Sequence, residues 1–361
     1  MGQSEAIFLT GFPGFIASRL VRRLAPEGYD LILLVQSAFL ARAQSEIAEI
    51  AKITETSADR FKLIEGDITL PGLGLQASDL EDLLRRTTYI YHLAAVYDLA
   101  VSRDLAITVN VEGTTNINAL AGEMPNLKRY HYVSTCYVAG ERRGIIRESE
   151  LDHDAGFRNY YEETKYLAEK TVEDLKRRLP ITIHRPAVVC GDSSTGETAK
   201  YDGVYYLILY LLKYPSLLSR LNIGNNEVKL NLVPVDYVVE AMALLLEDDK
   251  AIGQTIQIAD PAPLSTQELF NSISRTITGH GSAVTLPPGL VQTTLTLRVS
   301  PSLTGLPVSG VPYFFINQTY DTANATRLLT PHGLRCPEFP SYVGNLVEFV
   351  KEHRKLDAKA G

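Results

Sequence analysis

The chain has 361 residues, of which 45% are hydrophobic and 21% are charged. This is an ordinary balance for a globular protein with a sizeable buried core. A formal net charge of -7 argues against nucleic acid as a partner, because such a site needs a basic patch. The three cysteines are far apart and form no CxxC pair. We therefore expect neither a disulfide framework nor a metal site. We also expect a reducing, cytoplasmic location.

Two segments bear on membranes. The first strand-like run, Ala6–Thr10, begins almost at once and leaves no room for a signal peptide. Residues 299–320 are uncharged and long enough to cross a bilayer, but prolines and glycines interrupt them. We therefore expect an ordered loop region there and no transmembrane segment. This region can still touch a bilayer or a lipid-like ligand.

The first half of the chain alternates short apolar runs with amphipathic segments. The apolar runs predict strands at residues 6–10, 30–35, 60–65, 89–93, 129–134 and 180–189. Helical periodicity marks the segments between them, at residues 15–25, 41–57, 104–121 and 160–178. Apolar strands separated by helices are typical of a parallel sheet buried on both faces. The order predicts an α/β fold with a Rossmann-type, doubly wound sheet, whose ligand crevice lies beyond the carboxyl ends of the strands.

The amino-acid composition changes after residue 191, where Ser, Thr, Gly and Pro become frequent. We predict a Rossmann domain over residues 1–195, to which residues 235–260 return as a helix and a strand. Residues 196–234 and 261–361 would form a smaller, irregular substrate-binding domain. It contains a strongly apolar run at 204–212 and ends in a helix at 340–355.

A glycine-rich segment, TGFPGFIA at residues 10–17, follows the first strand and opens the first helix. Gly11 permits a tight turn, and Gly14 lets backbone N–H groups approach a pyrophosphate that faces the positive end of the helix. A plain strand–turn–helix is the alternative, but the position inside a βαβ alternation favours a nucleotide. The predicted contacts with a dinucleotide are those of the loop, namely Gly11, Phe12, Pro13, Gly14, Phe15 and Ile16.

The end of the second strand bears on the choice of coenzyme. An NAD site usually carries an acid there to bind the ribose hydroxyls. Here Gln36 follows the strand, and the next acid is Glu46. A 2′-phosphate would meet no negative charge, and Arg42 is near enough in sequence to help. NADP(H) is therefore favoured over NAD, although no arginine stands at the strand end itself.

The ends of the third and fourth strands supply further candidates. Asp67, followed by Ile68, would bind the adenine amino group, or it simply forms a turn. The segment HLAA at residues 92–95 places small residues where a dinucleotide would cross the sheet edge. Its expected contacts are Leu93, Ala94 and Ala95. His92 lies inside an apolar run, which is more typical of a core histidine than of a ligand.

A possible proton-transfer pair lies on the helix predicted from residue 160. Tyr161 and Lys165 are four residues apart and fall on one helical face. A nearby ammonium favours the phenolate, so we expect Lys165 to lower the pKa of Tyr161. Tyr161 would then give a proton to a carbonyl oxygen while a hydride arrives from the cofactor. Tyr166 and Lys170 have the same spacing, but on a rotated face, so the two pairs cannot serve one cofactor.

Two more polar residues complete the predicted catalytic set. Thr135 ends the fifth strand at the edge that carries the glycine loop, where its hydroxyl could stabilise an oxyanion. Ser134 would point the other way along the strand. Asn110 could orient Lys165 through water, or it is a structural polar group of its helix.

Together these segments resemble the extended short-chain dehydrogenase/reductase family. The resemblance covers roughly the first 260 residues. It rests on the glycine loop, HLAA at 92–95, NVEGT at 110–114, VST at 133–135, the Tyr161/Lys165 pair and Arg185-Pro186. It implies a hydroxyl, Tyr and Lys catalytic set, here Thr135, Tyr161 and Lys165, with threonine where many members have serine. It also implies a nicotinamide pocket lined by Pro186, Ala187, Val188 and Val189.

Within that family the chain is most similar to the fatty acyl-CoA reductase and thioester reductase branch. The similar segments are VSTCYV at 133–138, RPAVVCGD at 185–192, VPVDYV at 233–238 and the tail GLRCP at 333–337. The branch usually carries arginine where Gln36 stands, which weakens the argument for NADP. A homodimer through the helices at 104 and 160 is common in the family.

The resemblance implies hydride transfer from NADPH to an acyl-CoA or acyl-carrier thioester, which gives an aldehyde or an alcohol. The apolar segments 204–212 and 299–320 would wall an acyl tunnel, or they are simple core and loop packing. The alternative is a reductase of hydrophobic ketones or aldehydes. Coenzyme A phosphates need cationic partners, whereas cations are sparse between residues 196 and 330. The same scarcity argues against a nucleotide-sugar epimerase. A third possibility, a non-catalytic NADP-binding protein, would not need the proton donor.

Overall fold

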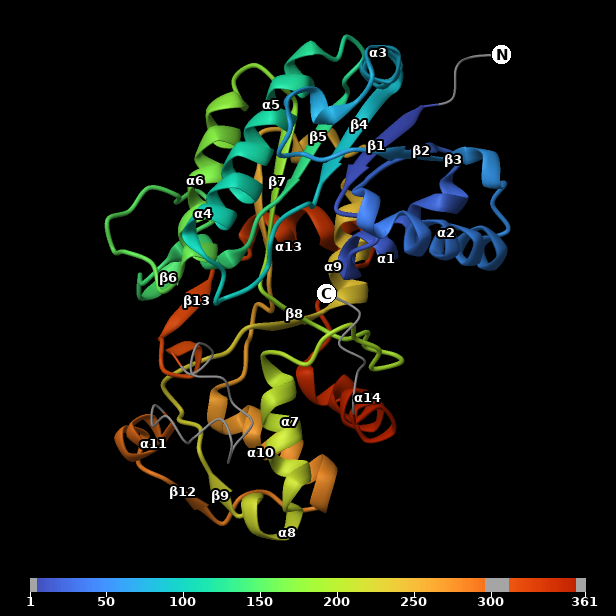
Figure 1. Ribbon diagram of the computed structural model, residues 1–361. Coiled ribbons are helices and arrows are strands. Elements are labelled where there is room, and N and C mark those ends of the chain that lie inside the picture. Colours follow the sequence, from blue (N-terminus) through green and yellow to red (C-terminus); the bar gives the residue numbers. More distant parts are fainter. Residues whose placement is uncertain (1–4, 296–311, 355–361) are drawn as a thin grey trace.

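The computed structural model describes residues 5–295 and 312–354, which form an upper lobe built on a sheet and a smaller lower lobe (Figure 1). Within these residues the main sheet has seven parallel strands in the order β11-β7-β5-β4-β1-β2-β3. The strands are β1 (Ala6–Thr10), β2 (Asp30–Val35), β3 (Phe61–Glu65), β4 (Thr87–His92), β5 (Arg129–Val133), β7 (Ile181–Pro186) and β11 (Thr255–Ile258). This order is that of a doubly wound Rossmann sheet, which confirms the predicted fold class.

Helices cover both faces of the sheet, as Figure 1 shows. One face carries α1 (Phe15–Leu24), α2 (Leu40–Thr54), α9 (Val235–Leu244) and α13 (Ala323–Leu329). The other carries α3 (Ala77–Arg86), α5 (Gly113–Glu123) and α6 (Tyr160–Leu175). Along β1, Ile7 and Leu9 pack toward the first face, and Ala6 and Phe8 toward the second. Because both faces are covered, the strand is apolar throughout.

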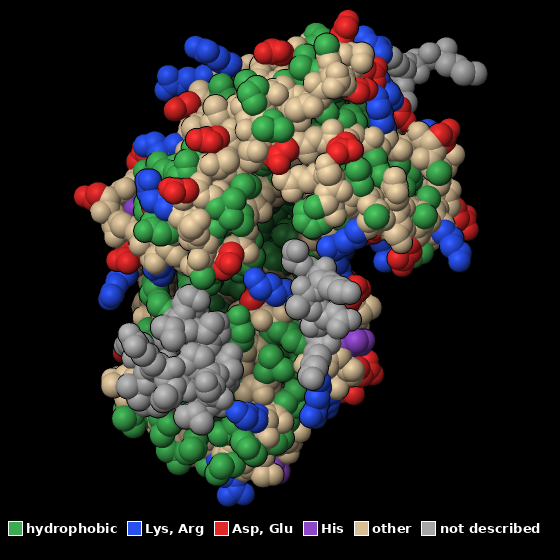
Figure 2. Space-filling view, in the orientation of Figure 1, with side chains coloured by type: hydrophobic (Ala, Val, Ile, Leu, Met, Phe, Trp, Pro, Cys, Tyr) green, Lys and Arg blue, Asp and Glu red, His purple; other side chains and the backbone are tan. Residues whose placement is uncertain are grey.

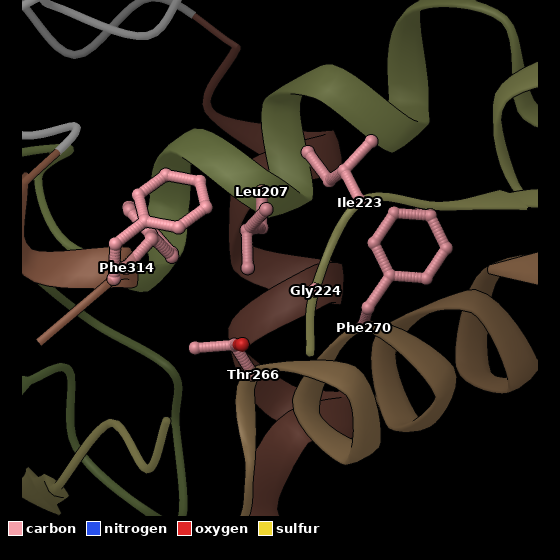
Figure 3. Close-up of a pocket in the computed structure, with 7 residues that line it drawn as sticks. Leu207, Ile223, Gly224, Thr266, Phe270 and Phe314 are labelled. Atoms are coloured by element: carbon pink, nitrogen blue, oxygen red, sulfur yellow. The ribbon is translucent and has the colours of Figure 1, made fainter. Parts of the chain in front are cut away.

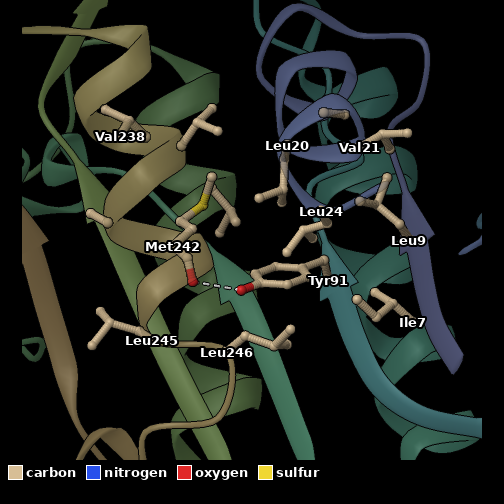
Figure 4. Close-up of a cluster of buried hydrophobic side chains, with 14 of the residues drawn as sticks. Ile7, Leu9, Leu20, Val21, Leu24, Tyr91, Val238, Met242, Leu245 and Leu246 are labelled. Atoms are coloured by element: carbon tan, nitrogen blue, oxygen red, sulfur yellow. Dashed lines mark hydrogen bonds between the residues drawn. The ribbon is translucent and has the colours of Figure 1, made fainter. Parts of the chain in front are cut away.

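Tyr91 of β4 packs in the core between α1 and α9. Leu20 and Leu24 of α1 approach Met242 of α9 around the ring of Tyr91 (Figure 4). The Tyr91 hydroxyl donates to the backbone oxygen of Met242 at 2.7 Å. This bond satisfies a buried polar group that would otherwise destabilise the core. Residues 235–260 include α9, which packs in this core, and β11, which pairs with β7.

Three elements differ from the sequence prediction. Residues 180–189 form two strands, because the backbone N–H of Ala187 still donates to Ile258 of β11, whereas that of Val188 donates to Asn231. β8 (Val188–Cys190) therefore pairs with β10 (Leu232–Pro234) in a separate sheet. The segment 104–121 begins as α4 (Arg103–Ala106) and continues as a π-helical turn (Ile107–Glu112) before α5. Helix α3 is not among the predicted elements.

The helices of the lower lobe are α7 (Val204–Lys213), α8 (Pro215–Leu218), α10 (Thr266–Thr278), α11 (Pro288–Leu295) and α14 (Phe339–Glu352). Helix α11 places Val291 in a small separate cluster, whereas α7, α10 and α14 share the main apolar core of this lobe. Leu207 of α7 and Phe270 of α10, both labelled in Figure 3, and Leu346 of α14 belong to this core. The apolar run 204–212 is therefore a helix with one face in the core. The domain boundary at residues 195 and 196 stays a prediction.

Short elements complete the described structure. Two further strand pairs are β9 (Leu221–Asn222) with β12 (Val284–Thr285), and β6 (Gly144–Ile146) with β13 (Gln318–Tyr320). The 3₁₀ turns are Ala25–Glu27, Ser37–Phe39, Ala58–Arg60, Pro71–Gly74, Cys136–Ala139, Asp249–Ala251 and Thr330–His332. Of the expected loop region at 299–320, residues 299–311 lie outside the described residues and 312–320 end in β13. Within residues 5–295 and 312–354, no helix is both long and apolar enough to cross a bilayer.

Two buried histidines make stability depend on pH. His131 and His184 stack, with Nδ1 of the first 2.9 Å from Nε2 of the second. Burial, together with nearby Arg129, lowers the pKa of His184 to about 3 and that of His131 well below its usual value. An unfolded histidine binds a proton below about pH 6.5. The stability that the neutral pair contributes is therefore complete above about pH 6.5 and is lost as the pH falls below it.

We expect the substitution His184→Leu to flatten this pH dependence. Between about pH 5.5 and 4.5 the free energy of unfolding of the variant should fall less steeply, by about 1.4 kcal/mol per pH unit. Urea unfolding of both proteins across this range measures the two slopes, and the carboxylates contribute equally to both. Parallel slopes would show that His184 is already charged in the folded chain.

Candidate active site

The glycine loop forms a cradle that a side chain would fill. Gly11 has φ +93°, and a Cβ there would lie 2.9 Å from the backbone nitrogen of Ala94. A Cβ on Gly14 would lie 2.6 Å from the oxygen of Gly11, to which the Gly14 N–H donates at 2.8 Å. Gly14 is the N-cap of α1, and the first turn of that helix carries no acid. The free helix N-terminus fits a pyrophosphate.

The other predicted loop residues line or support this cradle. Phe12 and Pro13 are buried, whereas Phe15 and Ile16 are half-buried at the start of α1. The segment after β4 lies against Gly11, so the structure brings Leu93 and Ala94 together with the loop, and their contact with a dinucleotide stays a prediction. Ala95 follows, half-buried.

Arg19, which sequence reasoning missed, is a cation close to this loop. Its guanidinium carbon lies 4.2 Å from the ring centroid of Phe15, and its NH2 lies 3.1 Å from Glu197. The ion pair joins α1 to the segment that enters the lower lobe. The spacing of four residues from Phe15 is the signal that could have placed Arg19 at the loop.

The predicted adenosine contacts lie at the ends of β2 and β3. Gln36 is exposed, and its Nε2 donates to Asp67 Oδ2 at 2.8 Å. The other carboxylate oxygen, Oδ1, accepts the N–H and the hydroxyl of Thr69, both at 2.8 Å. Although burial raises the pKa of Asp67, these hydrogen bonds hold it below its usual value. Asp67 is thus a turn residue in this structure, and its contact with adenine stays a prediction.

Two more residues that are predicted to contact the adenosine are less exposed than Gln36. Ile68 is buried against Gly113, where a Cβ would lie 2.6 Å from its Cδ1. Arg42 is half-buried on α2. Burial raises the pKa of Glu46, and the charge of Arg42 opposes this rise only in part. Arg42 therefore has an acidic neighbour on its own helix.

Thr135 and Tyr161 come together at the end of β5. Tyr161 is buried and packs edge-on against Tyr97, with ring centroids 5.1 Å apart. Thr135 Oγ1 accepts the backbone N–H of Tyr137 at 3.2 Å. Burial raises the pKa of Tyr161, and a hydrogen bond with Thr135 lowers it only in part. The expectation that Lys165 lowers this pKa was therefore wrong, because burial and the charge of Glu162 both raise it, whereas Lys165 Nζ binds other groups.

Lys165 lies one helical turn further along α6 and is also buried. Its Nζ donates to the Tyr132 hydroxyl and to the backbone oxygen of Val133, each at 2.9 Å. Burial lowers the pKa of Lys165 to about 7, against the opposing charge of Glu169. The group therefore titrates near neutral pH and can hold or release a proton there.

Asn110 lies in the π-helical turn and is buried. Its Oδ1 accepts the N–H of Val96 at 2.9 Å, and its Nδ2 donates to Thr164 Oγ1 at 3.0 Å. These contacts are those of a structural polar group that ties the turn to α6. The role of Asn110 in orienting Lys165 through water stays a prediction.

The side chains that the sequence analysis left out of the catalytic set bind other partners in the structure. The Ser134 hydroxyl donates to Glu169 in the interior. The hydroxyl of Tyr166 and the ammonium of Lys170 both bind Asp152, at 3.3 and 2.6 Å. His92 lies between the hydroxyls of Thr10 and Thr114, and burial lowers its pKa to about 3. It is therefore a core histidine.

The predicted nicotinamide pocket follows the end of β7. Pro186 is buried, whereas the next three residues, Ala187, Val188 and Val189, are half-buried where the chain passes from one sheet to the other. Figure 2 shows a hollow between the two lobes, with hydrophobic side chains deep inside it. The site therefore combines a phosphate cradle with a buried phenol and hydroxyl.

Residues 9–242 match the model of an NAD-binding family described as male sterility protein. The chain belongs to this family. It is 28% identical over 276 residues to fatty acyl-CoA reductase wat of Drosophila melanogaster, covering 66% of this chain and 53% of that protein. It is 25% identical over 288 residues to glycine betaine reductase ATRR of Emericella nidulans, covering 75% and 22%. The chain thus spans about half or less of these curated relatives.

Solved structures agree with this assignment. The terminal R domain from the myxalamid PKS-NRPS biosynthetic pathway is 26% identical with a TM-score of 0.83, covering 100% of this chain and 94% of that one. A UDP-glucuronic acid 4-epimerase from Bacillus cereus in complex with NAD, at 21% identity and a TM-score of 0.66, covers 99% and 100% and shows the shared fold. The chain therefore has the fold of an extended short-chain dehydrogenase/reductase and is similar to a fatty acyl-CoA reductase and to a terminal R domain, and its match to an NAD-binding family supports a nicotinamide cofactor.

Proposed function

We propose that this chain is an NADPH-dependent thioester reductase that converts an acyl-CoA or acyl-carrier thioester to an aldehyde or an alcohol. The observation that carries the proposal is the buried phenol of Tyr161 beside the Thr135 hydroxyl, at the sheet edge that holds the glycine cradle. The names of the relatives, which include a fatty acyl-CoA reductase and a terminal R domain, support the substrate class. The competing activity, reduction of a ketone or aldehyde, would use the same residues.

The residues support the following chemistry. When bound, the coenzyme would supply a hydride to the carbonyl carbon of the thioester. Thr135 and Tyr161 would donate hydrogen bonds to the carbonyl oxygen and stabilise its developing negative charge. Tyr161 stays protonated at neutral pH because its pKa is raised, so its phenol can give a proton to that oxygen. Loss of the thiol from the resulting hemithioacetal would leave the aldehyde.

NADP(H) is our proposal for the coenzyme. Gln36 follows β2 and carries no charge itself, although the Asp67 carboxylate lies 2.8 Å from its Nε2, and Arg42 and Arg19 are nearby cations on α2 and α1. A 2′-phosphate is stabilised by arginine and repelled by an acid at this position. We also propose a homodimer through the helical segment from α4 to α5 and through α6.

One assay separates the candidate functions. We expect NADPH and a long-chain acyl-CoA to react with loss of NADPH absorbance and release of free thiol in equal amounts for a two-electron reduction, and NADH to react more slowly. Oxidation of NADPH by ketones or aldehydes alone would support a carbonyl reductase, which the sparse cations between residues 196 and 330 favour. Coenzyme binding without turnover of any carbonyl would indicate a non-catalytic protein.

A further inference from the structure

A buried polar network runs from α6 to the glycine loop. Its members are Lys165 of α6, Tyr132 of β5, Thr114 of α5, His92 of β4 and Thr10 of β1. All of these residues are at most 3% exposed. The three strands are neighbours in the sheet, and α5 and α6 cover one face of it (Figure 1). Polar groups this deeply buried are stable only when hydrogen bonds satisfy them, so the partner of each hydrogen can be worked out.

His92 lies between two hydroxyls and carries a hydrogen on only one ring nitrogen. Burial lowers its pKa to about 3, so the ring is neutral at pH 7. The Thr114 hydroxyl has one hydrogen, which it donates to the backbone oxygen of Asn110 at 2.6 Å. Nε2 of His92, which is 3.0 Å from Thr114 Oγ1, is therefore the donor of that pair. Nδ1 must then accept, and the Thr10 hydroxyl donates to it at 2.7 Å.

The Thr10 end of the network meets the glycine cradle. Thr10 Oγ1 accepts the backbone N–H of Ala94 at 3.2 Å. The nitrogen of Ala94 is the atom that a Cβ on Gly11 would approach to 2.9 Å, so it belongs to the wall of the cradle. The network therefore fixes this wall to the core.

The other end of the network holds Lys165. Its Nζ donates to the Tyr132 hydroxyl and to the backbone oxygen of Val133, each at 2.9 Å. Burial holds the pKa of Tyr132 well above its usual value, so the phenol keeps its hydrogen while it accepts from the ammonium. That hydrogen is left for the bond between Tyr132 and Thr114, since the one hydrogen of Thr114 goes to Asn110. An ammonium has three donors, and the described residues supply acceptors for two of them.

We propose that Tyr132 is a positioning residue for the reduction: its hydroxyl, held by the network, keeps the Lys165 ammonium in a fixed place relative to the glycine cradle. The proposal rests on the proposed thioester reductase function, in which Tyr161, one helical turn before Lys165, gives up its proton. A charged Lys165 stabilises the phenolate that this step leaves. A hydrogen bond from an ammonium is about twice as strong as one between neutral groups, so the loss of one acceptor should weaken the charged form.

Few ionisable groups face Lys165. Tyr161 and Glu169 lie on its own helix, Tyr132 on β5 and His92 on β4. Tyr132 and His92 are neutral at pH 7, because burial raises the pKa of the first and lowers that of the second. The ammonium therefore depends on the Glu169 carboxylate and on its own hydrogen bonds.

The first test measures the pKa of Lys165 in the resting protein from the NMR shift of ¹³Cε-labelled lysine, and Lys165→Met identifies the signal. Tyr132→Phe keeps the ring and removes one acceptor of the ammonium. We expect the pKa of Lys165 to fall from about 7 by about one pH unit, the effect of one hydrogen bond to a charged group. Tyr130→Phe is the matched control and should leave this pKa unchanged. Tyr130 is equally buried on the same strand, but its hydroxyl donates to Asn118 at 2.9 Å.

The same change should appear in the reaction. The charged form of Lys165 is the active one in this proposal, so kcat for palmitoyl-CoA at saturating NADPH should fall as the pH rises through its pKa. With a pKa of about 7 in the wild type and about 6 in Tyr132→Phe, kcat of the variant should be about fivefold lower at pH 7 and about twofold lower at pH 6. A merely structural loss would lower kcat by one factor at every pH.

A second variant examines the rest of the network. Thr114→Val leaves the phenol in place and removes the acceptor of His92. Nitrogen-15 NMR of labelled histidine should show His92 protonated on Nε2 in the wild type and on Nδ1 in this variant. The pKa of Lys165 should fall by less than in Tyr132→Phe. Thr115→Val is the control, because Thr115 is exposed on the same helix and donates to the backbone oxygen of its own preceding turn.

These measurements separate the proposal from the function on which it rests. An unchanged pKa of Lys165 in Tyr132→Phe, or the same change in Tyr130→Phe, would overturn the proposal. A rate loss that is equal at every pH, or a wild-type His92 protonated on Nδ1, would also overturn it. A wild type that reduces no acyl thioester would overturn the reductase function, whereas the titration of Lys165 would still decide whether Tyr132 holds the ammonium.

Discussion

Replacing Tyr161 with phenylalanine is expected to lower the rate of carbonyl reduction by about 10²–10⁴-fold, the usual contribution of a general acid. The variant removes the phenol proton and its hydrogen bond with Thr135. The ring can still pack against Tyr97, so the fold and the coenzyme affinity should be unchanged. Single-turnover oxidation of NADPH measures the first effect, and a fluorescence titration with the coenzyme measures the second.

The helix itself supplies the control for this prediction. Tyr166 has a lysine four residues on, as Tyr161 does, but its hydroxyl binds Asp152 at the surface. Tyr166→Phe should therefore keep full activity. Undiminished turnover in Tyr161→Phe would remove the phenol from the mechanism. A similar loss in both variants would instead indicate damage to α6.

Much of the fold was predictable, because it depends on local patterns. The strands Ala6–Thr10 and Asp30–Val35 match the prediction to the residue. Both are apolar runs buried on two faces, with clear turn residues at their ends. The glycine loop was also predictable from the local sequence. Gly11 has φ +93° and approaches β4 closely, and both features require the absence of a side chain.

What the sequence could not supply depends on contacts between distant segments. The raised pKa of Tyr161 comes from its burial, which no spacing along one helix reveals. Tyr313 meets Glu162 across 151 residues of sequence, so only the folded chain shows this contact. The end of β7 was missed because Val188 continues the apolar run while its N–H changes partner to Asn231.

The second large effect concerns a buried ion pair beneath the site. Arg185 donates to Glu169 Oε1 from Nε at 2.8 Å and from NH2 at 2.6 Å. The two side chains are 1% and 0% exposed. Glu169 also accepts the hydroxyl of Ser134, so the pair joins α6 to the ends of β5 and β7. A carboxylate in this interior depends on its cation, because removal of one partner leaves an uncompensated charge.

We therefore expect Arg185→Met to lower the free energy of unfolding by about 3–5 kcal/mol, measured by urea unfolding at pH 7. That is a large part of the roughly 5–15 kcal/mol that typically holds a domain together. Arg103→Met should cost less than about 1 kcal/mol, since Arg103 and Glu163 form an exposed pair. Combining Arg185→Met with Glu169→Leu should restore most of the stability, because an apolar pair leaves no charge to desolvate. If the double variant is no more stable than Arg185→Met alone, the loss does not come from the stranded carboxylate but from packing around the methionine or from the backbone oxygens of Glu148 and Glu150, which Arg185 NH1 binds.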